Sequence, residues 1–297
     1  MTLSHAYPEP GRPARVVLLG AGGFLGQALA AACAAAGIEV KALGSRDVDL
    51  AEPSAATRLA GELRADDVLV FLAAITPDKG RDSAALMRNL AMARTVCEAV
   101  RAVALAQLVY ASSDAVYSFA TTLIAEETPA IPTDLYGAMH RTRELMLASE
   151  VKAPLAILRY CAIYGAGDTH NSYGPNRFVR QALKDGRIAL FGEGEETRDH
   201  LHIADAVAAT MNVIRHGSTG LVNLASGRSA TFRQVAELVA EVVAARAGRP
   251  VEIAASPRQN AVTHRHFDNA ALLRAFPGLG FTPLADGLSA LIAASKG

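Results

Sequence analysis

The sequence predicts an α/β protein with a doubly wound parallel β-sheet and a smaller C-terminal lobe. Short uninterrupted apolar runs, typical of strands buried on both faces, alternate with helical segments through the first half of the chain. A glycine-rich turn joins the first of these strands to the first helix. Beyond position 165 the alternation gives way to a long loop rich in Gly, Asn, Asp and Tyr, and then to shorter elements.

The elements of the first half follow from hydrophobic periodicity and helix-start signals. The predicted strands are 14–19, 38–43, 67–72, 107–110 and 155–158. The predicted helices are 24–36, 53–63, 82–103 and 134–149. Because helices then cover both faces of a parallel sheet, ligands bind beyond the carboxyl ends of its strands. The residues directly after each strand are therefore the first candidates for a functional role.

The second half is predicted to form mainly a substrate-binding lobe, over residues 166–297, with segments near 200–225 returning to the sheet. The predicted helices there are 177–184, one from about 203, 231–245 and two late ones near 269 and 284, and the predicted strands are 188–190 and 221–224. At the other end, residues 1–13 are expected to form a flexible tail. They hold three prolines and lack the apolar segment of a signal peptide.

Composition limits the possible partners. The 29 basic and 29 acidic residues cancel, which argues against binding to nucleic acid or to an anionic membrane surface. No apolar run reaches the roughly 18 residues of a membrane helix. Cys33, Cys97 and Cys161 lie in apolar segments without metal-ligand spacing. We therefore expect reduced thiols, a cytoplasmic protein and no bound metal.

The turn between the first strand and the first helix has the features of a diphosphate site. It directs free backbone N–H groups and the positive end of the helix dipole toward a ligand. Gly20 permits the turn, Gly23 lets the backbone approach the ligand, and Gly26 lets helix and strand pack closely. Residues 14–165 are therefore predicted to form a dinucleotide-binding, Rossmann-like domain. The alternative is a glycine turn that packs without a ligand.

The end of the second strand indicates which dinucleotide is bound. NAD-binding proteins often place an Asp or Glu there for the adenosine ribose. This chain has Ser45 and Arg46 instead, which favour the 2′-phosphate of NADP. Asp47, one residue later, leaves NAD open as the alternative. Arg46 is otherwise a solvated loop side chain.

The Gly-x-x-Gly-x-x-Gly spacing of the turn resembles that of the short-chain dehydrogenase/reductase superfamily, in particular its extended branch of NAD(P)-dependent sugar epimerases, dehydratases and reductases. The resemblance covers residues 15–291. It implies cofactor contacts at the turn, at the following strand ends and along the backbone beside the nicotinamide. The implied cofactor-binding residues are Gly20, Gly23, Phe24, Leu25, Gly26, Ser45, Arg46, Asp49, Leu50, Ala73, Ala74, Tyr136, His140, Tyr160 and Ile163.

The resemblance also implies a catalytic site. The stretch from Ser113 to Tyr117 is similar to the end of the family's Ser-Ser/Thr-x-x-Val-Tyr element, in which the Ser113 hydroxyl would bond the reacting oxygen of the substrate. Tyr136 takes the place of the general acid/base in the family's Tyr-x-x-x-Lys pattern, and Glu144 also matches. His140 replaces the lysine that holds the nicotinamide ribose and lowers the tyrosine pKa; when protonated, it would favour the tyrosinate. The alternatives are a serine cap and an ordinary, partly buried helix pair.

Further matches concern the substrate. Asp114 matches an acid of the family's sugar 4,6-dehydratases, but Ala115 replaces the Glu that serves as their base, so dehydration is not expected. Asn176 resembles a contact to a nucleotide-sugar diphosphate. Arg198 offers a planar fork for a phosphate, unless it only pairs with a surface carboxylate. With Ser113, these residues form the implied substrate site.

The expected function is hydride transfer at a sugar carbon of a nucleotide-activated sugar by an NAD(P)-dependent enzyme. The NADP-type strand end favours a 4-keto-sugar reductase over an epimerase. Two other hypotheses remain: a reductase of a non-nucleotide carbonyl substrate, and a non-catalytic dinucleotide-binding protein, which the missing lysine favours. The resemblance also implies a homodimer formed through helices 82–103 and 134–149.

Overall fold

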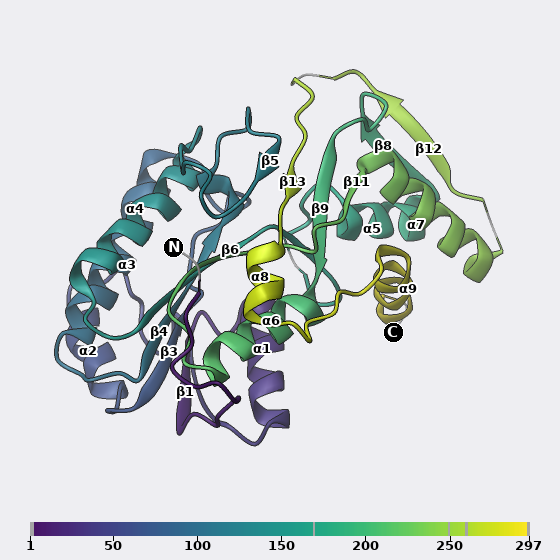
Figure 1. Cartoon of the computed structure of the whole chain (residues 1–297). Helices are drawn as coiled ribbons and strands as arrows, with labels where there is room; N and C mark the ends of the chain where they lie inside the picture. Colours follow the sequence, from purple (N-terminus) through teal and green to yellow (C-terminus); the bar gives the residue numbers. More distant parts are fainter. Residues whose placement is uncertain (1–2, 169, 249, 259–260, 296–297) are drawn as a thin grey trace.

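The computed structural model describes residues 3–168, 170–248, 250–258 and 261–295. The predicted α/β fold is confirmed: six parallel strands form one sheet in the order β10-β6-β4-β3-β1-β2 (Figure 1). These strands are β1 (Arg15–Leu19), β2 (Glu39–Leu43), β3 (Asp67–Phe71), β4 (Gln107–Ser113), β6 (Leu155–Tyr160) and β10 (Gly220–Leu224). Strand β4 runs further than the predicted 107–110, so that Ser113 is its last residue.

Helices cover both faces of this sheet (Figure 1). The helices are α1 (Phe24–Ala35) and α6 (Ile203–Arg215) on one face, and α2 (Ala55–Glu62), α3 (Ser83–Val100) and α4 (Leu135–Glu150) on the other. Successive side chains of a strand point to opposite faces. Val16 and Leu18 accordingly join the core beneath α1 and α6, whereas Val17 and Leu19 join the core beneath α2, α3 and α4.

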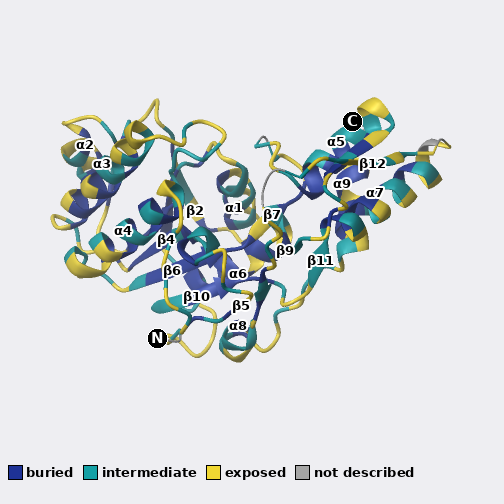
Figure 2. Cartoon of the chain, turned by 90° about the horizontal axis from the view of Figure 1, so that it is seen from above, coloured by how far each residue is buried: buried dark blue, intermediate teal, exposed yellow. Residues whose placement is uncertain are grey.

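A separate apolar core holds the C-terminal lobe together (Figure 2). It lies among α5 (Pro175–Asp185), β8 (Arg187–Phe191), α7 (Phe232–Ala247), β12 (Glu252–Ser256) and α9 (Leu284–Ala294). A small sheet of β7 (Ala162–Tyr164), β9 (Thr197–His202) and β11 (Ser229–Thr231) lies between the two cores. The short pair β5 (Leu123–Ile124) and β13 (His266–Phe267), the helix α8 (Ala270–Ala275) and the 3-10 turn η1 (Asp114–Val116) complete the described elements.

The N-terminal segment, for which the sequence predicts a flexible tail over 1–13, makes contacts with the domain from residue 4 onward. Ser4 forms a backbone bridge with Thr219, and the N–H group of Tyr7 donates to the carbonyl of His216. Arg12 donates to the carbonyl of Gly37. The attachment uses backbone groups together with the side chains of Ser4, His5 and Arg12. Residues 1–2 of the predicted tail lie outside the described residues.

A close backbone approach fixes the start of α4 beside the end of β4. A Cβ built on Gly137 would lie 2.0 Å from the carbonyl oxygen of Ala115, so only glycine lets the helix lie this close to η1. The carboxylate of Asp134 caps the helix by accepting from the N–H group of Gly137 at 2.7 Å. Tyr136 and Ser113 are thereby carried to the same edge of the sheet.

Replacing Gly137 with Ala is expected to destabilise the protein, because the added methyl group has to displace the Ala115 backbone. Overpacking of this kind costs about 1–3 kcal/mol, which urea denaturation measures. Gly61→Ala is the matched control. Gly61 lies in α2, where an added Cβ would meet no neighbouring segment within 4 Å, so alanine there is expected to gain about 0.4–1 kcal/mol. Equal free energies of unfolding for the two variants would show that α4 and η1 are not in close backbone contact at Gly137.

Candidate active site

The glycine turn has the geometry of a diphosphate cradle. Gly20 has a φ of +90°, and a Cβ there would lie 2.8 Å from the backbone nitrogen of Ala73. A Cβ on Gly26 would lie 2.5 Å from the Gly20 carbonyl oxygen. Gly23 is exposed and begins α1 without a side-chain cap, so the first helical N–H groups face an open surface. An uncapped helix start of this kind fits an anionic diphosphate.

The end of β2 leaves a cation free for the adenosine end of a dinucleotide. The carboxylate of Asp47 accepts from the N–H group of Gly44 at 2.8 Å and thereby closes its own turn. Asp49 is paired with Arg88 at 2.8 Å. Arg46 is exposed, and within the described residues its side chain makes no hydrogen bond or ion pair. The residue suited to a 2′-phosphate is therefore available, whereas the neighbouring carboxylates are engaged.

The catalytic candidates lie at the carboxyl edge of β4. The Ser113 hydroxyl accepts from the N–H group of Ala115 at 3.1 Å and donates to the carboxylate of Asp114 at 3.3 Å, so it also caps η1. Tyr136 is partly buried, and its hydroxyl has no hydrogen-bond partner among the described residues. Burial raises the pKa of Tyr136, the charge of Asp114 raises it further, and the cation of Arg143 lowers it.

The surroundings of His140 disfavour the protonated form on which its expected role depends. Its ring is buried, with Nδ1 2.8 Å from the hydroxyl of Tyr110. Burial and the nearby cation of Arg143 hold the pKa of His140 well below its ordinary value. The ring meets that of Tyr136 edge to face, with 4.7 Å between centroids. His140 thus packs against the tyrosine but cannot supply the charge of a lysine.

Glu144, which matches the family pattern, anchors the catalytic helix to the sheet. Its carboxylate accepts from the guanidinium of Arg159 at 2.7 and 2.8 Å and from the hydroxyl of Ser112 at 2.6 Å. Arg141 adds a contact at 3.0 Å. Because Arg159 lies on β6 and Ser112 on β4, the network fixes α4 across two strands.

Two of the predicted contact residues are engaged inside the protein. The amide of Asn176 donates to the carbonyl of Gly165 at 2.7 Å and accepts from its N–H group at 3.0 Å. Asn176 is buried and braces this loop instead of presenting its amide to a diphosphate. The hydroxyl of Tyr160 lies 2.7 Å from that of Thr210 in the core, so only the Tyr160 backbone is left for the cofactor. Ile163 is partly buried on β7.

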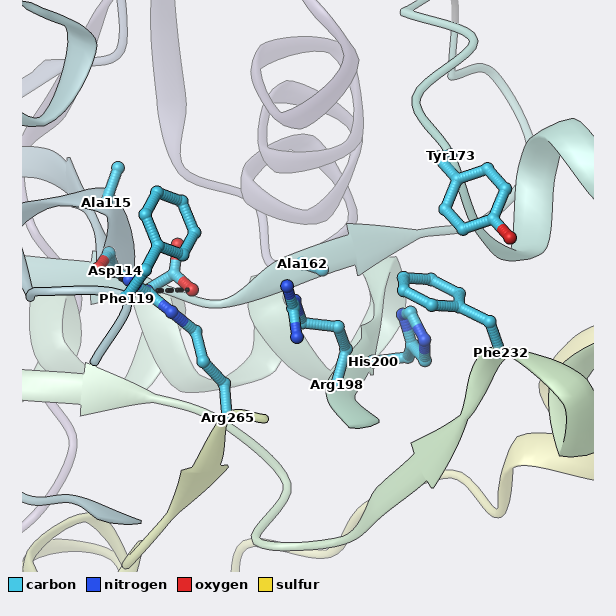
Figure 3. A pocket seen from close by; sticks show the side chains of 9 residues that line it. All are labelled: Asp114, Ala115, Phe119, Ala162, Tyr173, Arg198, His200, Phe232 and Arg265. Carbon is cyan, nitrogen blue, oxygen red and sulfur yellow. Dashed lines mark hydrogen bonds and ion pairs between the residues drawn. The ribbon is translucent and has the colours of Figure 1, made fainter. Parts of the chain in front are cut away.

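A cavity of about 220 Å³ begins directly after Ser113 and extends toward the lobe (Figure 3). Its lining residues are Asp114, Ala115, Phe119, Ala162, Tyr173, Arg198, His200, Phe232 and Arg265. The guanidinium of Arg265 pairs with the carboxylate of Asp114 at 2.9 Å. Arg198 donates to the backbone and hydroxyl of Thr263 and makes no ion pair within the described residues. The cavity therefore joins the catalytic edge to a cation suited to a phosphate.

Several lining residues could not be recognised from the sequence. Arg265 follows the last motif by more than sixty positions and belongs to no local pattern. Tyr173 and Phe232 pack against each other on one side of the cavity, with 4.5 Å between centroids, although they come from different segments of the lobe (Figure 3). Arg143 lies outside the cavity lining and was also missed. One feature of the sequence could have identified it: it stands seven residues after Tyr136 and therefore on the same face of α4.

Other classes of site find no support in the described part of the chain. No group of three or more His, Cys, Asp or Glu side chains is placed to hold a metal ion there. The cysteines Cys33, Cys97 and Cys161 are buried thiols. None of the helices in this part is long and apolar enough to cross a membrane.

Residues 16–225 match the family model described as the NAD dependent epimerase/dehydratase family. The chain belongs to this family, which confirms the resemblance seen in the sequence. It is an enzyme of the extended short-chain dehydrogenase/reductase type. The glycine turn and the open start of α1 fit the nicotinamide dinucleotide that such an enzyme uses.

Solved structures share this fold over nearly the whole chain. UDP-glucose 4-epimerase from Thermus thermophilus, in complex with NAD, is 21% identical, with a TM-score of 0.80 over 95% of this chain and 99% of that one. UDP-N-acetylglucosamine 4-epimerase from Methanobrevibacter ruminantium M1 is 18% identical, with a TM-score of 0.82 over 96% and 99%. RMD from Pseudomonas aeruginosa, complexed with NADPH, is 25% identical, with a TM-score of 0.79 over 95% and 98%.

The buried histidine of the cavity gives the protein a predictable acid sensitivity. Burial, helped by repulsion from Arg198, lowers the pKa of His200 to about 3. Below about pH 6.5 the His200 imidazole binds a proton in the unfolded chain but not in the folded chain. The contribution of His200 to the free energy of unfolding is therefore fully present above that pH and is lost as the pH falls. We expect His200→Phe to reduce the slope of the free energy of unfolding against pH by up to about 1.4 kcal/mol per pH unit.

The measurement is the free energy of unfolding as a function of pH for the parent and the variant. Phenylalanine suits the site because Tyr164 and Phe232 already surround the ring. His264→Gln is the control, because it removes a histidine that is exposed and lies outside the cavity lining. If the free energy of unfolding of His200→Phe depends on pH as steeply as that of the parent, His200 is not buried in its neutral form.

Proposed function

We propose that the protein transfers hydride at a carbon of a nucleotide-activated sugar, as a 4-keto-sugar reductase or an epimerase. The observation that carries this proposal is one continuous arrangement: Ser113 and Tyr136 lie at the sheet edge, and the cavity that starts beside them leads to Arg198. A sugar at the catalytic edge would place its diphosphate toward this unpaired guanidinium. Several structures of the same fold contain UDP-sugars, which supports this class of substrate.

The proposed chemistry gives the hydroxyl groups of Tyr136 and Ser113 separate roles at the reacting oxygen of the sugar. A bound nicotinamide supplies or accepts the hydride. The Tyr136 hydroxyl gives a proton to the reacting sugar oxygen during reduction, or takes one during oxidation. The Ser113 hydroxyl, now shared with Asp114, turns to donate to the same oxygen. Because Ala115 stands where the related dehydratases carry a Glu base, we assign hydride transfer and not elimination of water to this edge.

The NADP form of the cofactor is proposed because Arg46 is free whereas Asp47 is engaged in its own turn. This choice favours the reductase, since an epimerase has to retain one cofactor through a transient keto-sugar. The NADPH complex of the 25% identical RMD gives further support. Tighter equilibrium binding of NAD than of NADP would contradict the proposal.

A reductase of a non-nucleotide carbonyl compound is the second candidate. It would use the same catalytic edge but would leave Arg198 without an anionic partner inside the cavity.

We also propose a homodimer formed through α3 and α4, whose side chains Met87 and Leu145 are 63% and 53% exposed. A monomeric mass in sedimentation equilibrium would contradict it.

Tyr136→Phe is expected to lower turnover of the sugar substrate by about a hundredfold or more, because the proton donor is removed. Dinucleotide affinity and melting temperature should stay close to those of the parent, since the hydroxyl has no partner to lose. Tyr7→Phe is the matched control at a tyrosine that is 56% exposed. Full turnover by Tyr136→Phe would rule out the acid/base role.

Arg198→Ala is expected to weaken binding of nucleoside diphosphates by about tenfold or more, because a charge-assisted contact to phosphate is lost. Calorimetric titration with UDP, GDP, CDP and dTDP measures the effect and also ranks the bases. Arg187→Ala, at a largely exposed arginine of β8 outside the cavity lining, should bind as the parent does. Unchanged affinity in Arg198→Ala would favour the non-nucleotide carbonyl substrate.

A further inference from the structure

The catalytic helix carries a buried cation two turns beyond Tyr136. Residues 136, 140 and 143 share one face of α4, because neighbours on a helix surface are three or four positions apart. Position 140, where the related pattern has a lysine, holds a neutral histidine. Position 143 holds Arg143, whose side chain is completely buried.

Arg143 is held by neutral groups only. Its guanidinium donates to the carbonyl of Asn89 at 2.7 and 3.0 Å, to the Asn89 side-chain oxygen at 2.9 Å and to the carbonyl of Ala73 at 2.9 Å. It also lies over the ring of Phe71, 4.8 Å from the centroid. No carboxylate forms an ion pair with it in the part of the chain that the structure describes. A guanidinium remains charged when buried, so this site holds an uncompensated positive charge.

One of the groups on which this charge acts is the phenol that the proposed reaction uses. The cation of Arg143 lowers the pKa of Tyr110 and of Tyr136 and so favours the ionised form of each. Ala73, whose carbonyl it binds, lies at the end of β3 against the glycine turn. The field of a charge is weakly screened inside a protein, so its effect on a neighbouring phenol is larger than at the surface.

His140 connects the two tyrosines. Its Nδ1 bonds the hydroxyl of Tyr110, and its ring contacts that of Tyr136. The charge of Arg143 acts on Tyr110, so the arrangement in which the phenol directs its proton away from the cation and donates it to His140 Nδ1 is favoured. The remaining ring proton then lies on Nε2, which has no partner among the described residues.

We propose that Arg143 is the positioning residue that supplies, from two turns away, the positive charge that position 140 lacks. It favours the ionised form of Tyr136 through its field, and it fixes the His140 tautomer through Tyr110. It also holds the Ala73 backbone that borders the cofactor cradle. This inference rests on the proposed function of Tyr136, and its primary readout is a property of the protein without cofactor.

The test is a pH titration of the Tyr136 phenol by carbon-13 NMR of labelled tyrosine, with the signal assigned by its loss in Tyr136→Phe. Arg143→Gln removes the charge but keeps an amide donor for the Asn89 and Ala73 carbonyls. We expect it to raise the pKa of Tyr136 by about 1 unit or more, so that roughly tenfold less tyrosinate is present at a given pH. Arg143→Lys keeps the charge and should stay close to the parent.

Asn89→Ala and a double variant separate charge from structure. Asn89→Ala removes a partner of Arg143 and loosens the Ile75 backbone, so it lowers stability but should leave the Tyr136 pKa unchanged. The double variant His140→Lys with Arg143→Gln moves the cation to the position one turn after Tyr136. It should return the Tyr136 pKa to the parental value or below, and the pH profile of turnover should shift with it.

The outcomes are distinct. A Tyr136 pKa in Arg143→Gln equal to that of the parent, with stability lowered as in Asn89→Ala, would reduce Arg143 to a structural residue. If Arg143→Gln does not fold, Asn89→Asp decides instead, because a carboxylate at this position would compensate the charge of Arg143: a Tyr136 pKa equal to that of the parent contradicts the proposal. Shifted pKa values together with full turnover in Tyr136→Phe would overturn the function of Tyr136 but leave the electrostatic role of Arg143 in place.

Discussion

The position of every catalytic group depends on backbone contacts that a single methyl group would block. Gly26 lets α1 approach the Gly20 carbonyl, and Gly137 lets α4 approach η1. The first contact directs uncapped N–H groups toward a dinucleotide, and the second brings Tyr136 to the strand end that holds Ser113. Because these are contacts between backbones, side-chain rearrangement cannot relieve an added Cβ. Both helices are therefore positioned against the sheet by backbone contacts, and the cavity begins where the second of these contacts lies.

Electrostatics then divides the site into two regions. Near α4 the surroundings are buried, His140 is neutral, and the positive charge comes from Arg143, which no carboxylate pairs among the described residues. In the cavity the charges are Arg198 and the Asp114–Arg265 ion pair. The first region suits proton exchange at a phenol, and the second suits an anionic ligand. In the proposed reaction, this separation would let one edge of the sheet act on a sugar carbon and hold a diphosphate.

Local patterns in the sequence were sufficient for the sheet, the glycine turn and the positions of Ser113 and Tyr136, because each depends on a few neighbouring residues. They were insufficient where a side chain's role depends on distant segments. Asn176 matches a ligand-binding motif but is engaged by Gly165, and His140 loses its charge to burial that no local pattern reveals. Residues 3–13 show no local pattern because their backbone groups and the side chains of Ser4 and His5 bond a segment two hundred positions away.

A crystal structure with NADP and a nucleoside diphosphate bound tests the central claim most directly. The account predicts the dinucleotide diphosphate on the N–H groups of residues 24–26, the nicotinamide beside the Tyr136 hydroxyl, and the second diphosphate at Arg198. A Tyr136 hydroxyl directed into the core, or a glycine turn covered by side chains, would contradict it.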